Sequence, residues 1–193
     1  MTLNKRQLQK EQTRKQIINA AYQIYAEQGF TATTSDIARS IHVSHGTIFV
    51  HFPTRDDLLI QLLEDFDSRI VTRMHELTET SEQIPDVLYA HLNAIEEYEG
   101  FYTRLINESR LLPAEVRNNF IAIQSTIAFH MSKVIRKDPV LSKCDLPSYF
   151  IFNTWVGLVH YYLQNNDMFA PESSVIGRYK DELIANFLKL IKT

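Results

Sequence analysis

Residues 33–58 (TTSDIARSIHVSHGTIFVHFPTRDDL) constrain the fold of this chain more than any other segment. They predict two short helices joined by a tight turn at His42 and Val43. Thr34 and Ser35 stand at the expected start of the first helix and are residue types that cap helices. Hydrophobic residues at one-turn spacing give this helix a single buried face: Ile37, Ala38 and Ile41.

The second short helix is expected over residues 45–51, with the Ser44 hydroxyl as its cap. Ile48 and Phe52 lie four residues apart and are expected to point toward the core. The opposite face carries small, polar and imidazole side chains: His45, Gly46, Thr47, Val50 and His51. The major groove of DNA has room for one α-helix, and a helix with such a face fits there. The segment therefore predicts a helix-turn-helix unit that docks into duplex DNA.

This segment closely resembles the DNA-binding domain of TetR-family transcriptional repressors, whose pattern runs roughly T-x-x-x-I-A-x-x-A-G-V-S-x-G-T-L-Y-x-H-F-x-x-K-x-x-L. The matching residues are Ile37, Ala38, Val43, Ser44, Gly46, Thr47, His51, Phe52 and Leu58, with Ile48, Phe49 and Arg55 as near substitutes. So many matches in one register make the resemblance specific. It covers about the first third of the chain, and the remainder resembles the family in length and helical character.

Two positions depart from the family pattern. His42 stands where the family has a turn glycine, and a side chain at positive φ costs conformational energy, although His tolerates it better than most residues. Phe49 replaces a tyrosine and lacks the hydroxyl that would bond a phosphate. Arg55 replaces a lysine and can still pair with phosphate, even bidentately. We expect these changes to shift affinity or site preference without removing DNA binding.

The resemblance and the exposed face together predict which side chains meet DNA. The residues nearest the bases are expected to be His45, Gly46, Thr47 and Val50. Those at the phosphates are expected to be Thr33, Ser44, His51 and Arg55, helped by backbone N–H groups at helix starts, with Phe49 against the sugar-phosphate edge. The expected partner is a double-stranded DNA operator.

Basic charge is concentrated in the part of the chain that carries this unit. The formal net charge of the whole chain is −3. Residues 1–55 contain seven Lys/Arg and three Asp/Glu, a net charge of +4, whereas residues 56–193 contain thirteen and twenty, a net charge of −7. The asymmetry favours phosphate contact by the N-terminal segment. The basic residues at the start of the first helix form either a solvated helix end or an arm near the phosphates: Lys5, Arg6, Lys10, Arg14 and Lys15.

The composition is that of an ordinary globular protein, with 45% hydrophobic and 22% charged residues over 193 positions. No hydrophobic run is long enough to span a bilayer, and no N-terminal signal region is evident, so we expect no membrane partner and a cytoplasmic location. The single Cys144 excludes an intrachain disulfide framework and agrees with a reducing compartment.

The spacing of hydrophobic residues predicts an all-α protein of about nine helices. A first helix is expected over residues 5–28, and a long fourth helix is expected to begin after Thr54 and extend to about Thr80. Further helices are expected over residues 85–99, 101–112, 113–137, 147–169 and 174–192. We therefore expect a three-helix N-terminal helix-turn-helix domain over residues 1–53. A C-terminal helical ligand-binding and dimerisation domain is expected over residues 54–193.

The last two predicted helices are hydrophobic over much of their circumference, so they must be buried on more than one side. Resemblance to the TetR family implies that they pair with the same two helices of a second subunit; the alternative is burial within one chain. A homodimer also meets a physical need, because two recognition helices can read half-sites about 34–36 Å apart.

The TetR resemblance also implies an unidentified small-molecule effector that binds in the C-terminal domain and shifts the spacing of the two heads. The middle helices mix aromatic and polar side chains, as ligand cavities commonly do. The expected lining residues are Phe101, Tyr102, Phe120, Gln124, Phe129, Trp155 and His160. The alternative is that these residues are ordinary core.

No enzyme activity, metal site or cofactor is expected. His45 and His51 are six positions apart, roughly 600° of rotation about a helix axis, so their rings point to different sides. No HExxH, paired-cysteine, GxSxG, Walker or dinucleotide motif is present. The prediction is a ligand-responsive, sequence-specific DNA-binding regulator, a repressor released from its operator by an inducer. A helical small-molecule-binding or interaction protein that has lost DNA binding is the alternative, which His42 and Phe49 keep open.

Overall fold

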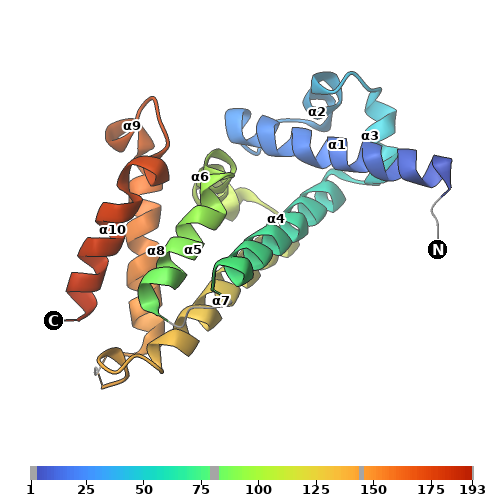
Figure 1. Ribbon diagram of the computed structural model, residues 1–193. Coiled ribbons are helices and arrows are strands. Elements are labelled where there is room, and N and C mark those ends of the chain that lie inside the picture. The colour runs from blue at the N-terminus through green and yellow to red at the C-terminus, as the bar shows by residue number, and fades with distance from the viewer. Residues whose placement is uncertain (1–3, 79–82, 144–145, 193) are drawn as a thin grey trace.

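The computed structural model describes residues 4–78, 83–143 and 146–192. These residues form ten α-helices and two short 3₁₀ helices, Ser109–Leu111 and Leu141–Lys143, and contain no strands (Figure 1). The α-helices are α1 (Lys5–Gln28), α2 (Thr34–Ser40), α3 (His45–His51), α4 (Arg55–Thr78), α5 (Ile84–Glu96), α6 (Glu99–Glu108), α7 (Ala114–Ile135), α8 (Ser148–Gln164), α9 (Asn166–Phe169) and α10 (Val175–Ile191). The predicted all-α class is confirmed. Cys144 and the predicted helix end near Thr80 lie outside the described residues.

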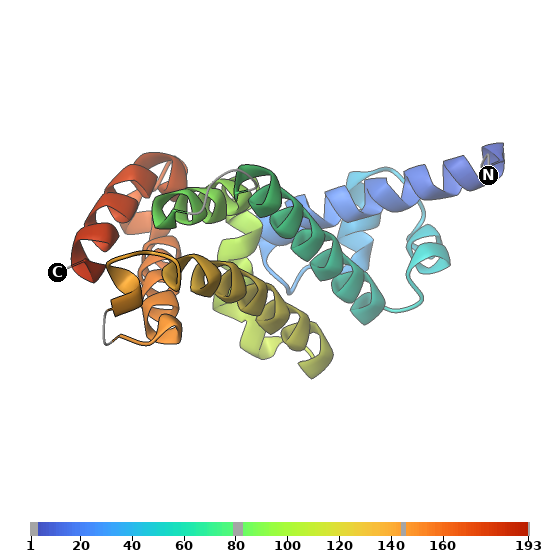
Figure 2. The ribbon, with the colours of Figure 1, turned by 60° about the horizontal axis from the view of Figure 1, so that its bottom comes forward.

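The molecule is elongated, with a head of three helices at one end and a helical body at the other (Figures 1 and 2). Helices α1, α2 and α3 form the head, and α4 leads from it into the body. Helices α8 and α10 lie side by side at the far end of the body. The start of α1 and the end of α10 are therefore at opposite ends of the molecule.

Side-chain caps define where the helices of the head begin. Asn4 and Gln7 form a reciprocal capping box at the start of α1. Thr33 and Asp36 do the same at α2, so the predicted cap at Thr34 or Ser35 is wrong. Thr33 is the residue whose extended backbone points its hydroxyl at the free N–H groups of the first turn. The capping box of Thr54 with Asp57, predicted for the fourth helix, is present.

Three aromatic rings join the head to the body. The ring of Tyr22 on α1 lies 4.9 Å from that of Phe101 on α6 and 6.4 Å from that of Phe66 on α4. The rings of Phe66 and Phe101 are 5.4 Å apart, and both side chains are fully buried. Edge-on aromatic contacts of this kind add to the free energy of burial. The second half of α1 is thus packed on the body as well as on the head.

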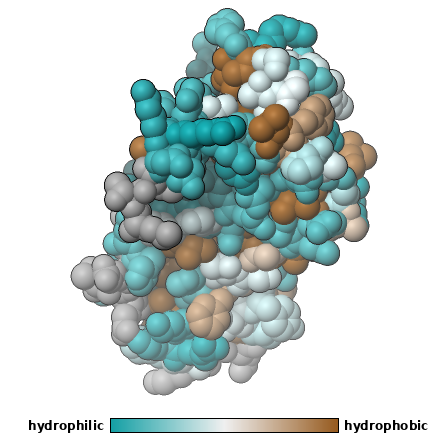
Figure 3. All heavy atoms as spheres, turned by 90° about the vertical axis from the view of Figure 1, so that its right-hand side faces the viewer, coloured by the Kyte–Doolittle hydropathy of each residue, from teal (hydrophilic) through white to brown (hydrophobic). Residues whose placement is uncertain are grey.

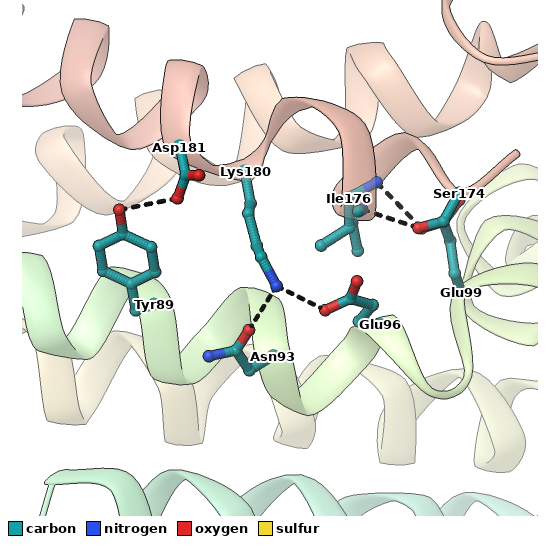
Figure 4. A network of polar contacts seen from close by, with 9 residues as sticks. Tyr89, Asn93, Glu96, Glu99, Ser174, Ile176, Lys180 and Asp181 are labelled. Atoms are coloured by element: carbon teal, nitrogen blue, oxygen red, sulfur yellow. Dashed lines mark hydrogen bonds and ion pairs between the residues drawn. The ribbon is translucent and has the colours of Figure 1, made fainter.

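Helix α6 is anchored at both ends by polar contacts. At its start, the Glu99 carboxylate accepts hydrogen bonds from the Ser174 hydroxyl and from the backbone N–H groups of Val175 and Ile176, at 2.6–3.0 Å (Figure 4). A carboxylate there satisfies the free N–H groups at the start of α10. At the other end of α6, Arg104 donates to the carbonyl oxygens of the last turn of α1. Glu108 accepts a 2.7 Å bond from the N–H of Phe30.

The region predicted as one helix over residues 147–169 is divided in two. Helix α8 ends at Gln164, and Asn165 has φ −112° and ψ 38°, outside the helical range. The Tyr161 carbonyl accepts from both the side chain and the backbone N–H of Asn165, at 2.7 and 3.3 Å. The single turn α9 follows, which is why ten α-helices are described where about nine were predicted.

No helix in the described part of the chain combines the length and the hydrophobicity needed to cross a membrane.

Candidate nucleic-acid interface

Helices α2 and α3 pack together through a tight turn and present α3 at the surface of the head (Figure 1). His42 lies in the turn with φ 56°, the positive value that the family pattern assigns to glycine. Ile48 and Phe52 are buried as predicted, with exposed fractions of 0% and 1%. The Ser44 hydroxyl accepts from the N–H of Thr47 and caps α3. The predicted pair of helices with its tight turn is therefore confirmed.

Much of the outer face of α3 is exposed and is not covered by other described parts of the chain. Val50 is 70% exposed and Phe49 is 40% exposed. His45 and Gly46 are exposed, and Thr47 is half-buried. Gly46 brings the backbone to the surface with only the Ser44 hydroxyl nearby, so this end of α3 is narrow enough to enter a groove.

His45 has one ring nitrogen committed inside the protein. Its Nε2 atom lies 2.8 Å from the Thr34 hydroxyl of α2, and its ring lies edge-on to Phe49, 4.8 Å between centroids. These contacts fix the imidazole plane and leave Nδ1 as the nitrogen that can meet a base. Sequence reasoning missed this pairing, because the two residues are eleven positions apart and lie on different helices.

The hydroxyls expected at phosphates take part in caps. The Thr33 hydroxyl donates to the Asp36 carboxylate at 2.6 Å, and the Ser44 hydroxyl lies 2.8 Å from that of Thr47. Both Thr33 and Ser44 are exposed. The bond to Thr33 lowers the pKa of Asp36 below its usual value, so a carboxylate charge lies next to that expected phosphate contact. Phosphate contact by Thr33 and Ser44 stays a prediction.

Arg55, expected at a phosphate, is half-buried and donates to the carbonyl oxygen of Phe30. This bond ties the start of α4 to the turn between α1 and α2. The guanidinium has five N–H donors, so this bond leaves others for a second acceptor. A phosphate role for Arg55 stays a prediction, and the structure adds a role in holding the head together.

His51 is placed at the junction of α1 and α3. Its carbonyl oxygen accepts from Arg14 of α1 at 2.9 Å, and the Arg14 guanidinium lies 4.3 Å from the Phe52 ring centroid. Burial, Lys10 and Arg14 lower the pKa of His51, so its ring is neutral at neutral pH. Its Nδ1 atom is buried and has no hydrogen-bond partner. Any contact of His51 with a phosphate is therefore made by a neutral imidazole.

A groove of about 560 Å³ separates the start of α1 from α3. Its lining residues include Arg6, Lys10 and Gln7 from α1 and Thr47, Val50 and His51 from α3. The first turns of α1 extend past α3 (Figure 2), and residues 4–12 are all exposed. Figure 3 shows mostly hydrophilic surface at this end of the molecule, with hydrophobic residues in scattered patches. The basic start of α1 thus lies beside the exposed face of α3.

The residues expected to line an effector cavity are only partly brought together. Tyr102 and His160 are in contact, and the ring of Phe120 lies 6.1 Å from that of Tyr102. Gln124 lies near the Tyr102 hydroxyl, and Phe101 is buried beside Tyr22 and Phe66. Trp155 is fully buried and donates to His91. Phe129 is 62% exposed on α7 and is not brought together with the others.

Among the described residues, no group of three or more His, Cys, Asp or Glu side chains is arranged to hold a metal ion.

Comparisons with known proteins point to one family. The family model described as "Bacterial regulatory proteins, tetR family" matches residues 17–62, the segment that contains α2 and α3. The chain is 32% identical over 91 residues to the HTH-type transcriptional regulator HbdR of Aromatoleum sp. (strain CIB), covering 45% of this chain and 40% of that protein. It is 37% identical over 62 residues to the fatty acid metabolism regulator protein of Bacillus subtilis (strain 168), covering 32% of each. The chain thus matches less than half the length of these relatives.

The similarity of fold extends over the whole molecule. The crystal structure of the transcriptional regulator FadR from Bacillus subtilis in complex with stearoyl-CoA superposes with a TM-score of 0.71 at 18% identity. The match covers 93% of this chain and 97% of that one. The body of this chain therefore has the same architecture as the FadR body, although few residues are shared. Residues 17–62, which contain the helix-turn-helix of α2 and α3, therefore match the tetR family of bacterial regulatory proteins.

Proposed function

We propose that this protein is a dimeric repressor that binds duplex DNA in a sequence-specific way and is released by a small-molecule inducer. The observation that carries the proposal is the exposed face of α3 beside the basic start of α1. A helix with this face can enter the major groove while cations beside it reach phosphates. The relatives matched by the head are transcriptional regulators, which supports the same function. The site of action would be the cytoplasm, where DNA is found.

Within this proposal, the head over residues 1–53 reads DNA and the body over residues 54–193 binds effector and partner. Helix α4 connects the two parts. In addition, aromatic contacts pack α1 of the head against α4 and α6, through Tyr22, Phe66 and Phe101. A movement of α4 or α6 would therefore change the position of α1 and of the head. A ligand acts only if it binds one head position more tightly than the other.

The dimer is proposed to form through α8 and α10. The α8 side chains of Tyr149, Phe150 and Tyr161 are more than half exposed, an unusual position for aromatic residues in a lone subunit. A Cβ atom added at Gly157 would meet nothing within 4 Å, so a helix from a second subunit has room to approach closely there. A twofold dimer places two α3 helices on one face of a duplex.

A negative charge introduced on α3 tests DNA binding directly. Val50→Glu places a carboxylate on the face of α3 that is expected to meet the bases. It should abolish selection of a preferred sequence from a random duplex library, because the negative potential of the DNA would repel the added charge. Ile121→Glu is the matched control: Ile121 is 52% exposed on α7, so this change adds the same charge to the body. Wild-type protein that selects no sequence, or a Val50→Glu variant that selects like wild type, would refute the proposed interface.

The alternative, a helical binding protein without DNA affinity, rested on His42 and Phe49. His42 occupies the turn with φ 56° and does not prevent α3 from forming. Phe49 is exposed and orients the His45 ring. Neither substitution removes the exposed face of α3, so DNA binding is the better-supported function.

A further inference from the structure

Neutral polar side chains from four helices meet in the middle of the body. Trp155 of α8 donates its Nε1 hydrogen to Nδ1 of His91 of α5, at 2.9 Å. Nε2 of His160, also on α8, lies 2.8 Å from the hydroxyl of Tyr102 of α6. The Gln124 side chain of α7 lies near the same hydroxyl. We call these five side chains the His91 cluster.

The bond from Trp155 determines which nitrogen of His91 carries its hydrogen. Since Nδ1 accepts, a neutral His91 ring has its hydrogen on Nε2. Nε2 is buried and has no hydrogen-bond partner, and the whole residue is only 1% exposed. A buried donor left without an acceptor is costly, and buried polar groups nearly always have a partner. The position in front of Nε2 is therefore suited to an oxygen acceptor from a bound molecule.

Among the described residues, no hydrogen bond or ion pair joins the His91 cluster to a charged side chain. Burial lowers the pKa of His91 to about 3, with a smaller effect from nearby His160. Burial alone lowers the pKa of His160 to about 4. An ionised ligand would thus lose its hydration without gaining a counter-charge, which is strongly unfavourable.

Aromatic side chains flank the same group and suit a hydrophobic molecule. The Phe120 ring lies 6.1 Å from the Tyr102 ring, and the Phe187 ring lies 5.0 Å from the Trp155 ring. A few polar anchors within an aromatic wall are the usual makeup of a small-molecule site.

We propose that the His91 cluster recognises the effector, and that the effector is an uncharged, largely hydrophobic molecule whose carbonyl oxygen accepts a hydrogen bond from Nε2 of His91. This inference rests on the proposed function, because it assumes that the body binds an effector. It adds the chemical class of the ligand and the residue that distinguishes a neutral carbonyl from a carboxylate.

The fluorescence of Trp155 provides a direct test, since it is the one tryptophan of the chain and its indole is bonded to His91. The full-length protein, without DNA, is titrated with methyl decanoate, 2-undecanone and acetophenone, and in parallel with the anions decanoate and benzoate. Saturable changes are expected for at least one neutral carbonyl compound. Its matched anion should bind at least roughly tenfold more weakly, because a buried carboxylate would lack a cation.

Two substitutions separate recognition from packing. His91→Phe keeps a ring but removes the donor, and it should weaken binding of the responding carbonyl compound by about 5-fold to 150-fold. His91→Gln retains a neutral N–H donor and should bind the same compound within about fivefold of wild type. This variant still tests the proposal if His91→Phe does not fold. Tyr89→Phe on the same helix removes an exposed hydrogen bond to Asp181 and serves as the control with unchanged binding.

Three outcomes would overturn the inference: no response to any neutral carbonyl compound, equal or tighter binding of the matched anion, or undiminished binding by folded His91→Phe protein. The same preparation is also tested for sequence selection from the random duplex library. This measurement separates failure of the inference about the effector from failure of the proposed DNA-binding function. A protein that selects DNA but ignores all carbonyl probes contradicts only the inference about the effector.

Discussion

Nε2 of His45 lies 2.8 Å from the hydroxyl oxygen of Thr34, so the first residue of the recognition helix is tied to the preceding helix. Thr34 is buried, whereas His45 is exposed. The bond thus restricts the orientation of the imidazole, and we expect Nδ1 to be the nitrogen that meets DNA. A histidine held this way can distinguish bases, because its ring does not have to be ordered on binding.

His45→Ala should change base preference at one position of each half-site. The preferred base should lose about 1–3 kcal/mol of discrimination, the usual value of a good base contact. Selection from a random duplex library measures this. Thr34→Val removes the hydroxyl that bonds Nε2 of His45 and leaves the imidazole in place. This variant should prefer the same base with weaker discrimination. An unaltered preferred site in His45→Ala protein would show that this ring makes no base contact.

Arg55→Ala should affect both DNA binding and stability. If Arg55 holds a phosphate, the slope of log affinity against log salt should fall by about one unit per head. Loss of the donor to the Phe30 carbonyl should also lower the free energy of unfolding, on the order of 1–3 kcal/mol. Salt titration and urea denaturation measure the two effects. Arg39→Ala, which removes an exposed arginine paired with Asp36, is the control for charge. A lower stability with an unchanged salt slope would make Arg55 a purely structural residue.

Gly29→Ala should destabilise the junction between head and body. Gly29 has φ 73° and ψ −178°, a conformation nearly restricted to glycine that costs other residues about 1–3 kcal/mol. A Cβ atom there would also lie 2.6 Å from Oε1 of Glu108. Urea denaturation should show the loss. Adding Glu108→Ala removes the collision but not the backbone strain, so the double variant should not regain the stability of Glu108→Ala alone. Wild-type stability in Gly29→Ala would contradict the described backbone.

Folding stability should fall as the pH drops below neutrality. In the folded state the pKa of His91 is lowered to about 3 and that of His160 to about 4, whereas both have pKa values near 6.5 when unfolded. The unfolded state therefore binds more protons below pH 6.5, and stability is lost as the pH falls from about 6.5 toward 4. Urea midpoints at several pH values measure this. His91→Gln should flatten the dependence, and an equally steep profile in that variant would remove His91 as a cause.

Gly157→Leu should weaken the dimer while leaving the subunit folded. The Cβ position at Gly157 is open in the single chain, so the larger side chain obstructs only a second subunit. Sedimentation velocity gives the oligomeric state, and circular dichroism gives the helix content. Ser125→Leu on the exposed face of α7 is the matched control. A Gly157→Leu protein that dimerises like wild type would place the interface elsewhere.

Features that depend on neighbours in the sequence were predicted well. The buried positions of Ile37, Ala38, Ile48 and Phe52 follow from one-turn spacing, and the Ser44 cap follows from its place before a periodic run. The break at Asn165, whose backbone has φ −112° and ψ 38°, was missed. Even within this local range, the cap at α2 was misplaced by a residue or two.

The sequence by itself determined the helices, the turn at His42 and the concentration of basic charge near α3. Only the tertiary structure decided what the polar side chains contact: Thr34 beside His45, Arg55 on the carbonyl of Phe30, and Trp155 donating to His91, 64 positions away in the chain. The physical reason is range. Helix periodicity and capping act within about four residues, whereas the partner of a buried polar group depends on which helices pack together.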